Sequence, residues 1–380
     1  MTLDVVTFRG GRIFDGVRFH DDHAICFEGG KLAGFGPEDT LPDRGEVIDL
    51  SSDILSPGFL DLQVNGGDGI MLNDDPSVET LRRMSRAHRA LGVTQFLPTL
   101  ITDTPENTRA TINATIDAIR EGVPGIAGLH LEGPHLSVIR KGAHDADLIR
   151  PMEPEDLAVL IEVADSLPCL KVTIAPENVT EAQVTALADA GVLVSLGHTD
   201  ADYQTCRRYF DAGARCVTHL FNAMSQLGNR EPGLVGAALS RGAVSTGLIA
   251  DAIHVHPESI RAAWAAKTGP GRIFLVSDAM AVAGSDAKSF QLNNRTICRQ
   301  DGRLTLEDGT LAGADLDLIT AVRVMVKQVG VPLEDALNAA THTPAALIGA
   351  PLIAPSSVAC ELADLIRISE DLSRVSLLAP

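Results

Sequence analysis

The 380-residue chain is poor in aromatic side chains, which make up 4% of it and include one tryptophan and two tyrosines. Trp264, Tyr203 and Tyr209 are therefore the few candidates beyond phenylalanine for stacking on bases or sugar rings. Basic residues are scarce too: 31 Lys and Arg against 50 Asp and Glu give a net charge of −19 at pH 7. Such a field repels phosphate backbones and anionic membranes. We expect no nucleic-acid and no membrane partner, and an anionic small substrate would need a basic pocket of its own.

Paired cysteines and long apolar runs are also missing. The six cysteines form no CxxC pair, and a chain of this length does not need disulfides to fold. No uninterrupted apolar stretch reaches 18 residues, and the N-terminus lacks the basic and apolar segments of a signal peptide. We therefore expect a cytoplasmic protein that is not exported.

What is present is typical of a globular protein with two domains. Apolar residues make up 45% and charged residues 21% of the chain. A chain of 380 residues exceeds the roughly 250 to 300 at which one core stops growing. Short strands and Gly-Gly turns fill the first 50 residues, and two more strands are expected near the C-terminus, at 361–369 and 373–380. We predict a small β-sandwich domain from both termini, residues 1–55 plus 356–380, beside a large domain over 56–355.

The large domain shows apolar runs that alternate with helical stretches, many opened by Ser, Thr, Asp or Pro. The predicted strands are 59–64, 94–100, 126–133, 170–176, 191–198, 214–221, 244–251 and 272–279. Eight βα units in order predict a (β/α)₈ TIM-type barrel, in which chemistry lies at the C-terminal strand ends. An open doubly wound sheet is the structural alternative. After the eighth strand, residues 289–313 read as an inserted hairpin that turns at Asp301-Gly302.

Four of these apolar runs end in an ionisable side chain: Glu132, His198, His219 and Asp278. Any one of them alone could equally be a helix cap or a satisfied core residue. Four at corresponding places are harder to explain by packing, because burying each unpaired would cost several kcal/mol. A barrel would bring them to one rim, where a carboxylate and two imidazoles suit Zn²⁺ or a similar divalent ion.

Nine segments resemble the N-acetylglucosamine-6-phosphate deacetylase family of the amidohydrolase superfamily. They are PGFLDLQVNG (57–66), HLEGPH (130–135), KGAHDAD (141–147), SLGHTDA (195–201), THLFNAMS (218–225), REPGLVGAAL (230–239), IADAIHV (249–255), SDAM (277–280) and GTLAG (309–313). They span nearly the whole chain in the family's order, and HLEGPH and THLFNAM are the most specific. The resemblance implies a metal-dependent hydrolase that removes acetate from the 2-acetamido group of a sugar 6-phosphate.

The resemblance also implies roles for the residues at the rim. Glu132, His198 and His219 would hold one divalent ion per subunit, for which we expect Zn²⁺, with Fe²⁺, Co²⁺ or Mn²⁺ as alternatives. Asp278 would act as general base and then as acid. His144 would stabilise the substrate's carbonyl oxygen as charge develops.

Substrate contacts are implied in the same way. They are assigned to Ala143, Asn222, Ala223, Arg230, Asp251, His254, Leu311, Ala312 and Gly313. Among these, Arg230 and His254 would meet the phosphate, although Arg230 alone reads equally as a surface turn residue before Glu231-Pro232-Gly233. The resemblance implies a homodimer, in which some phosphate contacts come from the neighbouring subunit.

One departure from the wider superfamily concerns the first barrel strand. Many amidohydrolases place His-x-His there to hold a second metal, whereas this chain has Gln63-Val64-Asn65. Because an amide is a poor transition-metal ligand, we predict a single-metal site in which Gln63 and Asn65 hydrogen-bond to neighbouring groups.

Three alternatives stay open at this point. A deacetylase for the galactosamine epimer differs at one hydroxyl, which no residue pattern resolves. A cyclic amidase of the dihydroorotase type would use a carboxylated lysine, for which Lys171 is the candidate, but it usually needs the missing histidine pair. A sugar-phosphate sensor would bind without turnover. His342, in ATHTPAALIG, resembles a helix-start motif common in amidohydrolases and is expected to be structural.

Overall fold

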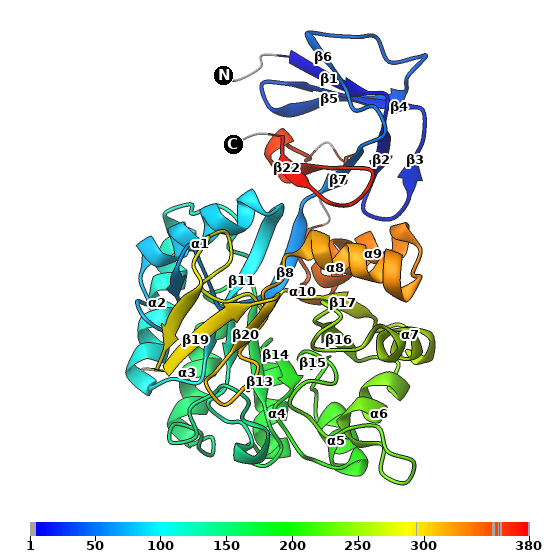
Figure 1. Ribbon diagram of the computed structural model, residues 1–380. Coiled ribbons are helices and arrows are strands. Elements are labelled where there is room, and N and C mark those ends of the chain that lie inside the picture. The colour runs from blue at the N-terminus through cyan, green and yellow to red at the C-terminus, as the bar shows by residue number, and fades with distance from the viewer. Residues whose placement is uncertain (1–4, 294, 352–353, 356, 358, 379–380) are drawn as a thin grey trace.

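A computed structural model describes residues 5–293, 295–351, 354–355, 357 and 359–378. Its centre is one eight-stranded parallel sheet in the order β17-β16-β15-β14-β13-β12-β11-β8 (Figure 1). The strands are β8 (Phe59–Val64), β11 (Val93–Ile101), β12 (Leu129–Glu132), β13 (Leu170–Ile174), β14 (Leu193–Leu196), β15 (Cys216–Val217), β16 (Ser245–Leu248) and β17 (Ile273–Leu275). A parallel bridge between Val64 and Ala279 joins the first strand to the segment after the last. The predicted (β/α)₈ barrel is thereby confirmed.

Each predicted strand is present, but most are shorter than expected. The run 191–198, for example, is a strand only over Leu193–Leu196, so His198 lies in the loop that follows. The same holds for 214–221, which pairs only at Cys216–Val217. The polar ends of these runs thus belong to loops at the rim of the barrel rather than to the sheet itself.

Helices form the outer layer of the barrel. They are α1 (Val78–Ala90), α2 (Pro105–Arg120), α3 (Pro154–Ala164), α4 (Glu181–Asp189), α5 (Tyr203–Asp211), α6 (Gly233–Ser240), α7 (Pro257–Ala266), α8 (Leu318–Val324) with its π-helical continuation Met325–Val329, α9 (Leu333–Ala340) and α10 (His342–Ile348). Capping explains several starts, since Ser77, Thr104, Thr180, Asp202 and Asp317 each accept a hydrogen bond from a backbone N–H of the first turn. None of the helices within the described residues has the length and apolar character needed to cross a lipid bilayer.

A small β-sandwich lies at one end of the molecule, near both termini (Figure 1). One sheet has the order β5-β4-β1-β6 and the other β22-β21-β7-β2-β3. The strands are β1 (Val5–Arg9), β2 (Arg12–Phe14), β3 (Phe19–His20), β4 (His23–Glu28), β5 (Lys31–Pro37), β6 (Glu46–Asp49), β7 (Ile54–Pro57), β21 (Leu365–Ile368) and β22 (Val375–Leu377). Antiparallel pairing of β21 with β7 confirms that both ends of the chain build this second unit. The bounds 1–55 plus 356–380 and 56–355 stay a prediction, and residues 356, 358, 379 and 380 lie outside the described part.

An insert of three strands follows the barrel: β18 (Ser289–Leu292), β19 (Arg295–Gln300) and β20 (Arg303–Thr305). Asp301 and Gly302 turn β19 into β20 with φ of 50° and 73°, as the Asp-Gly signal predicts. Buried Leu292, Ile297 and Leu304 belong to a separate apolar cluster that also holds Met71 and Met280 of the barrel rim. The insert is thereby packed beside the rim and delivers residues 309–313 to it.

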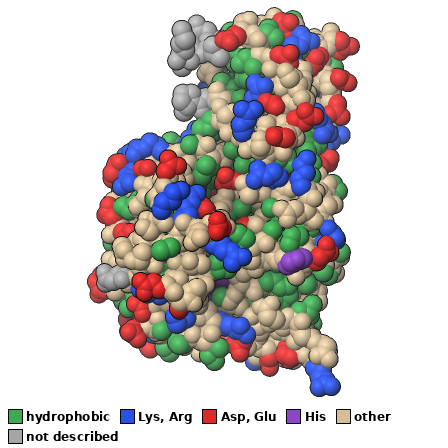
Figure 2. All heavy atoms as spheres, in the orientation of Figure 1, with side chains coloured by type: hydrophobic (Ala, Val, Ile, Leu, Met, Phe, Trp, Pro, Cys, Tyr) green, Lys and Arg blue, Asp and Glu red, His purple; other side chains and the backbone are tan. Residues whose placement is uncertain are grey.

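The smaller elements are β9 (Gly66–Gly67), β10 (Ile70–Met71) and the short 3₁₀ turns Val138–Arg140 and Leu362–Asp364. On the face shown in Figure 2, acidic and basic side chains are interspersed.

Candidate active site

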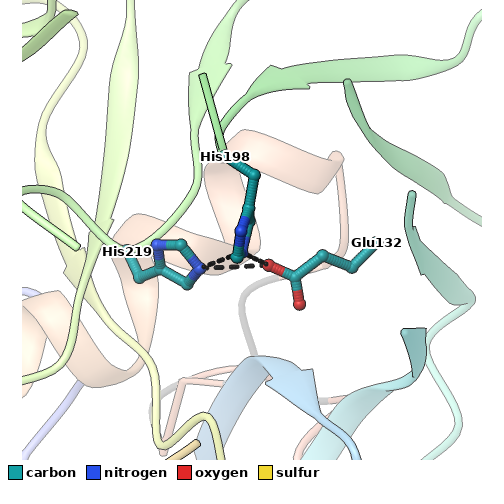
Figure 3. Close-up of side chains that lie close together, drawn as sticks. All are labelled: Glu132, His198 and His219. Carbon is teal, nitrogen blue, oxygen red and sulfur yellow. Dashed lines mark hydrogen bonds and ion pairs between the residues drawn. The ribbon is translucent and has the colours of Figure 1, made fainter. Parts of the chain in front are cut away.

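Glu132, His198 and His219 come together at the C-terminal ends of β12, β14 and β15 (Figure 3). Glu132 Oε1 lies 3.1 Å from His198 Nε2 and 3.0 Å from His219 Nε2. The two ring nitrogens are 3.1 Å apart. All three side chains are buried, with 2 to 5% of their surface exposed. The rim therefore gathers one carboxylate oxygen and two imidazole nitrogens around a single point.

This cluster fits one divalent metal ion. Its three ligand atoms all lie within 4.8 Å of one another. His198 Nδ1 lies 2.8 Å from the carbonyl oxygen of Arg140, so in the neutral ring Nδ1 carries the proton and Nε2 presents its lone pair to the cluster. Two lone-pair nitrogens and a carboxylate oxygen at such distances repel one another unless a cation or proton lies between them. Nitrogen and oxygen ligands in this number are typical of catalytic divalent sites.

Charge and hydrogen bonding support the ionised form of the carboxylate. Burial opposes the charge on Glu132, but the hydrogen bonds and the charge of His198 and His219 outweigh it and hold its pKa well below the usual value. For His219, burial is outweighed by Glu132, and its pKa is raised. His219 Nδ1 has no hydrogen-bond partner among the described residues.

Asp278 follows β17 and faces the same cluster. Its Oδ1 accepts hydrogen bonds from Gln63 Nε2 at 3.0 Å and from Asn65 Nδ2 at 2.8 Å. Gln63 Nε2 also lies 3.1 Å from Glu132 Oε2, so one amide ties the two carboxylates together. Burial, with the charge of Glu132, raises the pKa of Asp278. A buried carboxyl with raised pKa is a plausible proton acceptor and donor.

His144 lies on the loop between β12 and α3 and is 4% exposed. Its Nδ1 accepts a hydrogen bond from the backbone N–H of Thr102 at 3.3 Å. In the neutral ring the proton therefore resides on Nε2, where it can be donated. Burial and the electrostatic effect of the neighbouring His198 ring lower the pKa of His144 well below the usual value, which favours this neutral form.

The cluster opens into a cavity of about 520 Å³. Of the residues expected to contact substrate, the cavity is lined by Ala143, Asn222, Ala223, His254, Leu311 and Gly313. Asp251 lies behind His254 and accepts a hydrogen bond from its Nδ1 at 2.6 Å. Ala312 is fully buried in the apolar cluster of the insert. Arg230 is exposed and is outside the set of described residues that line this cavity.

Sequence reasoning missed Arg140, which lines the cavity with Ile139, Thr310 and Met280. Its guanidinium pairs with Asp200, with Nη2 2.6 Å from Oδ1, and its backbone carbonyl holds His198. The available signal was its position directly before KGAHDAD. Every residue has a backbone carbonyl, however, so the residue type at this position does not reveal the contact with His198. Arg295 of the insert was also missed, although its Nη2 donates to the carbonyl oxygen of Ala143 at 2.5 Å.

Comparison with known proteins places this site in a family. The model of the Amidohydrolase family matches residues 54–353. The chain is 44% identical over 302 residues to an N-acetylgalactosamine-6-phosphate deacetylase of Shewanella sp. (strain ANA-3), covering 80% of this chain and 76% of that one. It is 36% identical over 331 residues to the N-acetylglucosamine-6-phosphate deacetylase of Haemophilus influenzae, covering 86% of each. The crystal structure of N-acetylglucosamine-6-phosphate deacetylase from Pasteurella multocida superposes with a TM-score of 0.90 at 34% identity, over 97% of this chain and 96% of that one. The chain therefore belongs to the amidohydrolase family and, within it, to the N-acetylhexosamine-6-phosphate deacetylases.

Proposed function

We propose that this enzyme hydrolyses N-acetyl-D-glucosamine 6-phosphate to D-glucosamine 6-phosphate and acetate. The observation that carries the proposal is the buried cluster of Glu132, His198 and His219 with Asp278 beside it, at the bottom of a cavity large enough for a small molecule. The names of the relatives supply the substrate class. The free thiols of all six cysteines support a cytoplasmic location.

Glu132, His198 and His219 would hold one divalent ion, and Zn²⁺ suits their two nitrogens and one oxygen. Fe²⁺, Co²⁺ and Mn²⁺ accept the same donors. When bound, such an ion polarises the amide carbonyl and makes water more acidic. Gln63 and Asn65 donate to Asp278 at the place where a second metal's ligands would stand, which supports a single ion per subunit.

The chain's own groups then move the protons. Asp278 takes a proton from the attacking water as the new C–O bond forms at the acetamido carbon. It returns that proton to the sugar nitrogen as the C–N bond breaks, which leaves acetate and a free amine. His144 donates from Nε2 to the carbonyl oxygen, where negative charge develops.

Phosphate binding would begin with His254, which Asp251 holds in one orientation. Arg230 lies on an exposed segment near Leu227, whose apolar side chain is 57% exposed. Ile139, which lines the cavity, is 77% exposed, and its sequence neighbour Val138 is 52% exposed. A homodimer would cover such residues and bring Arg230 toward the partner's cavity. Sedimentation of the purified protein tests this, and a monomer at assay concentration would exclude it.

The decisive experiment measures acetate release by metal-replete protein from N-acetylglucosamine 6-phosphate. The unphosphorylated sugar and Asp278→Asn are run in parallel. Phosphate-dependent turnover that disappears in the variant is expected. No turnover with metal confirmed bound would redirect the search to other N-acyl and cyclic amides. Metal counting accompanies the assay, and two tightly held ions per chain would overturn the single-metal site.

The galactosamine epimer is the second candidate substrate, because the 44% identical relative is named for it. Comparing kcat/KM for the two epimers decides between them. A clear preference for N-acetylgalactosamine 6-phosphate would replace the substrate and leave the mechanism unchanged.

A further inference from the structure

A second cavity, of about 440 Å³, lies at the opposite end of the barrel strands. Arg272, which lines it, directly precedes β17, whereas Asp278 comes three residues after that strand ends. The other walls come from the C-terminal end of α7, from α9 and from the start of α10, and Figure 1 shows α7 and α9 next to β17. Its size falls within the roughly 300 to 1,000 Å³ of small-molecule sites.

Unpartnered polar atoms gather at this cavity as they do at the active site. Seven buried side-chain atoms have no hydrogen-bond partner within the described part of the chain. Three belong to Gln63, Asn65 and His219 at the active site, and two more, His342 Nδ1 and Asn338 Oδ1, belong to residues that line the second cavity. Buried polar atoms normally find partners, so these two atoms can each take up a hydrogen bond from a ligand or an ordered water.

Two cations face this cavity in a chain whose net charge is −19. Lys267 Nζ donates to the carbonyl oxygens of Thr268 at 2.7 Å and Arg241 at 3.1 Å, which fixes the ammonium and leaves one N–H free. The guanidinium of Arg272 forms no ion pair with any described residue, so its donors are available to an anion. The cavity wall thus carries two positive groups that a phosphate could bind.

The same cavity holds the only tryptophan of the chain, Trp264, together with the exposed carboxylate of Asp335. An indole presents a flat apolar face that suits the C–H face of a sugar ring. Asp335 and Asn338 supply oxygen acceptors for hydroxyl groups. A phosphorylated sugar can use the cations, the aromatic face and the acceptors together.

We propose that this second cavity is a binding site for a phosphorylated sugar. The phosphate binds Lys267 and Arg272, the ring lies against Trp264, and hydroxyl groups bind Asp335, Asn338 and His342. The site is separate from the cavity that contains Asp278, and its occupation is measured by binding rather than by turnover, so it stands or falls independently of the proposed reaction.

Tryptophan fluorescence tests the proposal on the metal-replete enzyme, because Trp264 reports this cavity and the active-site cavity contains no tryptophan. The titrants are D-glucosamine 6-phosphate, D-glucosamine and inorganic phosphate. We expect a saturable change with the phosphosugar and at least about tenfold weaker binding of either half alone. Inorganic phosphate that binds as tightly as the phosphosugar would overturn the assignment of a sugar, and the absence of any saturable change would overturn the site.

Matched variants separate the second cavity from the active site. Arg272→Ala should weaken the fluorescence-detected binding by about tenfold or more while acetate release persists. Arg215→Ala removes a cation from the corresponding place directly before β15 and should leave binding unchanged. Calorimetry with the same phosphosugar should show one binding event fewer per chain in Trp264→Ala than in the parent, whether or not the active site binds this sugar. Equal binding by the parent and Arg272→Ala would refute the proposal.

Discussion

The barrel rim and the terminal β-sandwich differ in where residues other than glycine adopt a left-handed backbone conformation, with positive φ. In the sandwich, positive φ occurs at Asp22 and Ser51, exposed turn residues whose φ values are 55° and 56°, and at one buried residue, Leu372 in the turn between β21 and β22, with φ of 62°. Short polar residues tolerate this conformation in turns. At the rim it occurs at His198, His219, Phe221, Ala223 and Asp278, with φ of 48°, 29°, 76°, 49° and 51°.

The comparison shows that unfavourable backbone conformations are tolerated at the barrel rim, at a cost in folding free energy. Phe221 and Ala223 gain nothing locally from a left-handed backbone, which costs about 1 to 3 kcal/mol per residue in such positions. The neighbouring packing holds them there, and the result is that His219 and Asn222 reach the cavity. Changes at the rim should therefore affect turnover, whereas changes in the sandwich should affect stability.

The largest effect is expected from Asp278→Asn. Turnover should fall by about 10² to 10⁴-fold, because the proton acceptor is gone. The free energy of unfolding should stay equal or rise, since the variant removes the repulsion between Asp278 and Glu132 and its amide oxygen still accepts from Gln63 and Asn65. Steady-state acetate release and urea unfolding measure the two quantities. Turnover near the parent's would show that Asp278 is not the base.

The reverse pattern is expected for Phe27→Ala in the sandwich core. Phe27 is 1% exposed, and its truncation should cost about 3 to 5 kcal/mol of unfolding free energy. The kcat of the protein that remains folded should not change. Val47→Ala, at an exposed position of β6, is the control and should be near neutral. A loss of kcat without a loss of stability would contradict the division between the two regions.

The two regions should also respond oppositely to pH. Burial, only partly offset by hydrogen bonds from Ser277 and Gln63, raises the pKa of Asp61, in barrel strand β8, from 3.8 to about 7. The folded state binds this proton more tightly than the unfolded state does. Asp61 therefore contributes to the free energy of unfolding below about pH 3.8, and this contribution is lost as pH rises toward 7. Hydrogen bonds from Ser369 and Ser373 lower the pKa of Asp371, in the turn between β21 and β22, to about 2. Asp371 therefore contributes to the free energy of unfolding above pH 3.8, and this contribution is lost as pH falls toward 2.

Asp61→Asn therefore should flatten the decline of stability between about pH 4 and 7. Urea unfolding of parent and variant at several pH values in this window measures the slope. Asp371→Asn serves as control and should leave that part of the profile as it is. Identical slopes in the parent and Asp61→Asn would mean that Asp61 titrates normally.

The smallest effect is expected on the outer layer of the barrel. Thr180 caps α4, with its Oγ1 accepting from the backbone N–H of Gln183 at 3.3 Å. Thr180→Ala should cost about 0.5 to 2 kcal/mol and leave kcat and KM unchanged. Thermal unfolding and acetate release provide both values. A shift in KM would show that the outer helices communicate with the rim more strongly than the comparison implies.

The barrel and the cluster of Glu132, His198 and His219 could be predicted because both require particular residue types at particular positions. Each strand is a buried apolar run, and Glu132, His198 and His219 interrupt three of those runs where the strands end. The contribution of Arg140 could not be predicted, because it acts on His198 through a carbonyl that every residue has. The exposure of Arg230 and the burial of Ala312 depend on how their loops pack, which local sequence does not encode.

The bond between Gln63 and Asp278 spans 215 positions of the chain and lies where the first and last barrel strands meet. The three residues of the metal cluster, by contrast, lie within 87 positions of one another. During synthesis on the ribosome, the three proposed metal ligands are therefore all made before Asp278, the proposed base, emerges. On the proposed mechanism, hydrolytic competence arrives together with closure of the barrel, and an incompletely synthesised or partly unfolded chain lacks the positioned carboxylate that would take the proton from water.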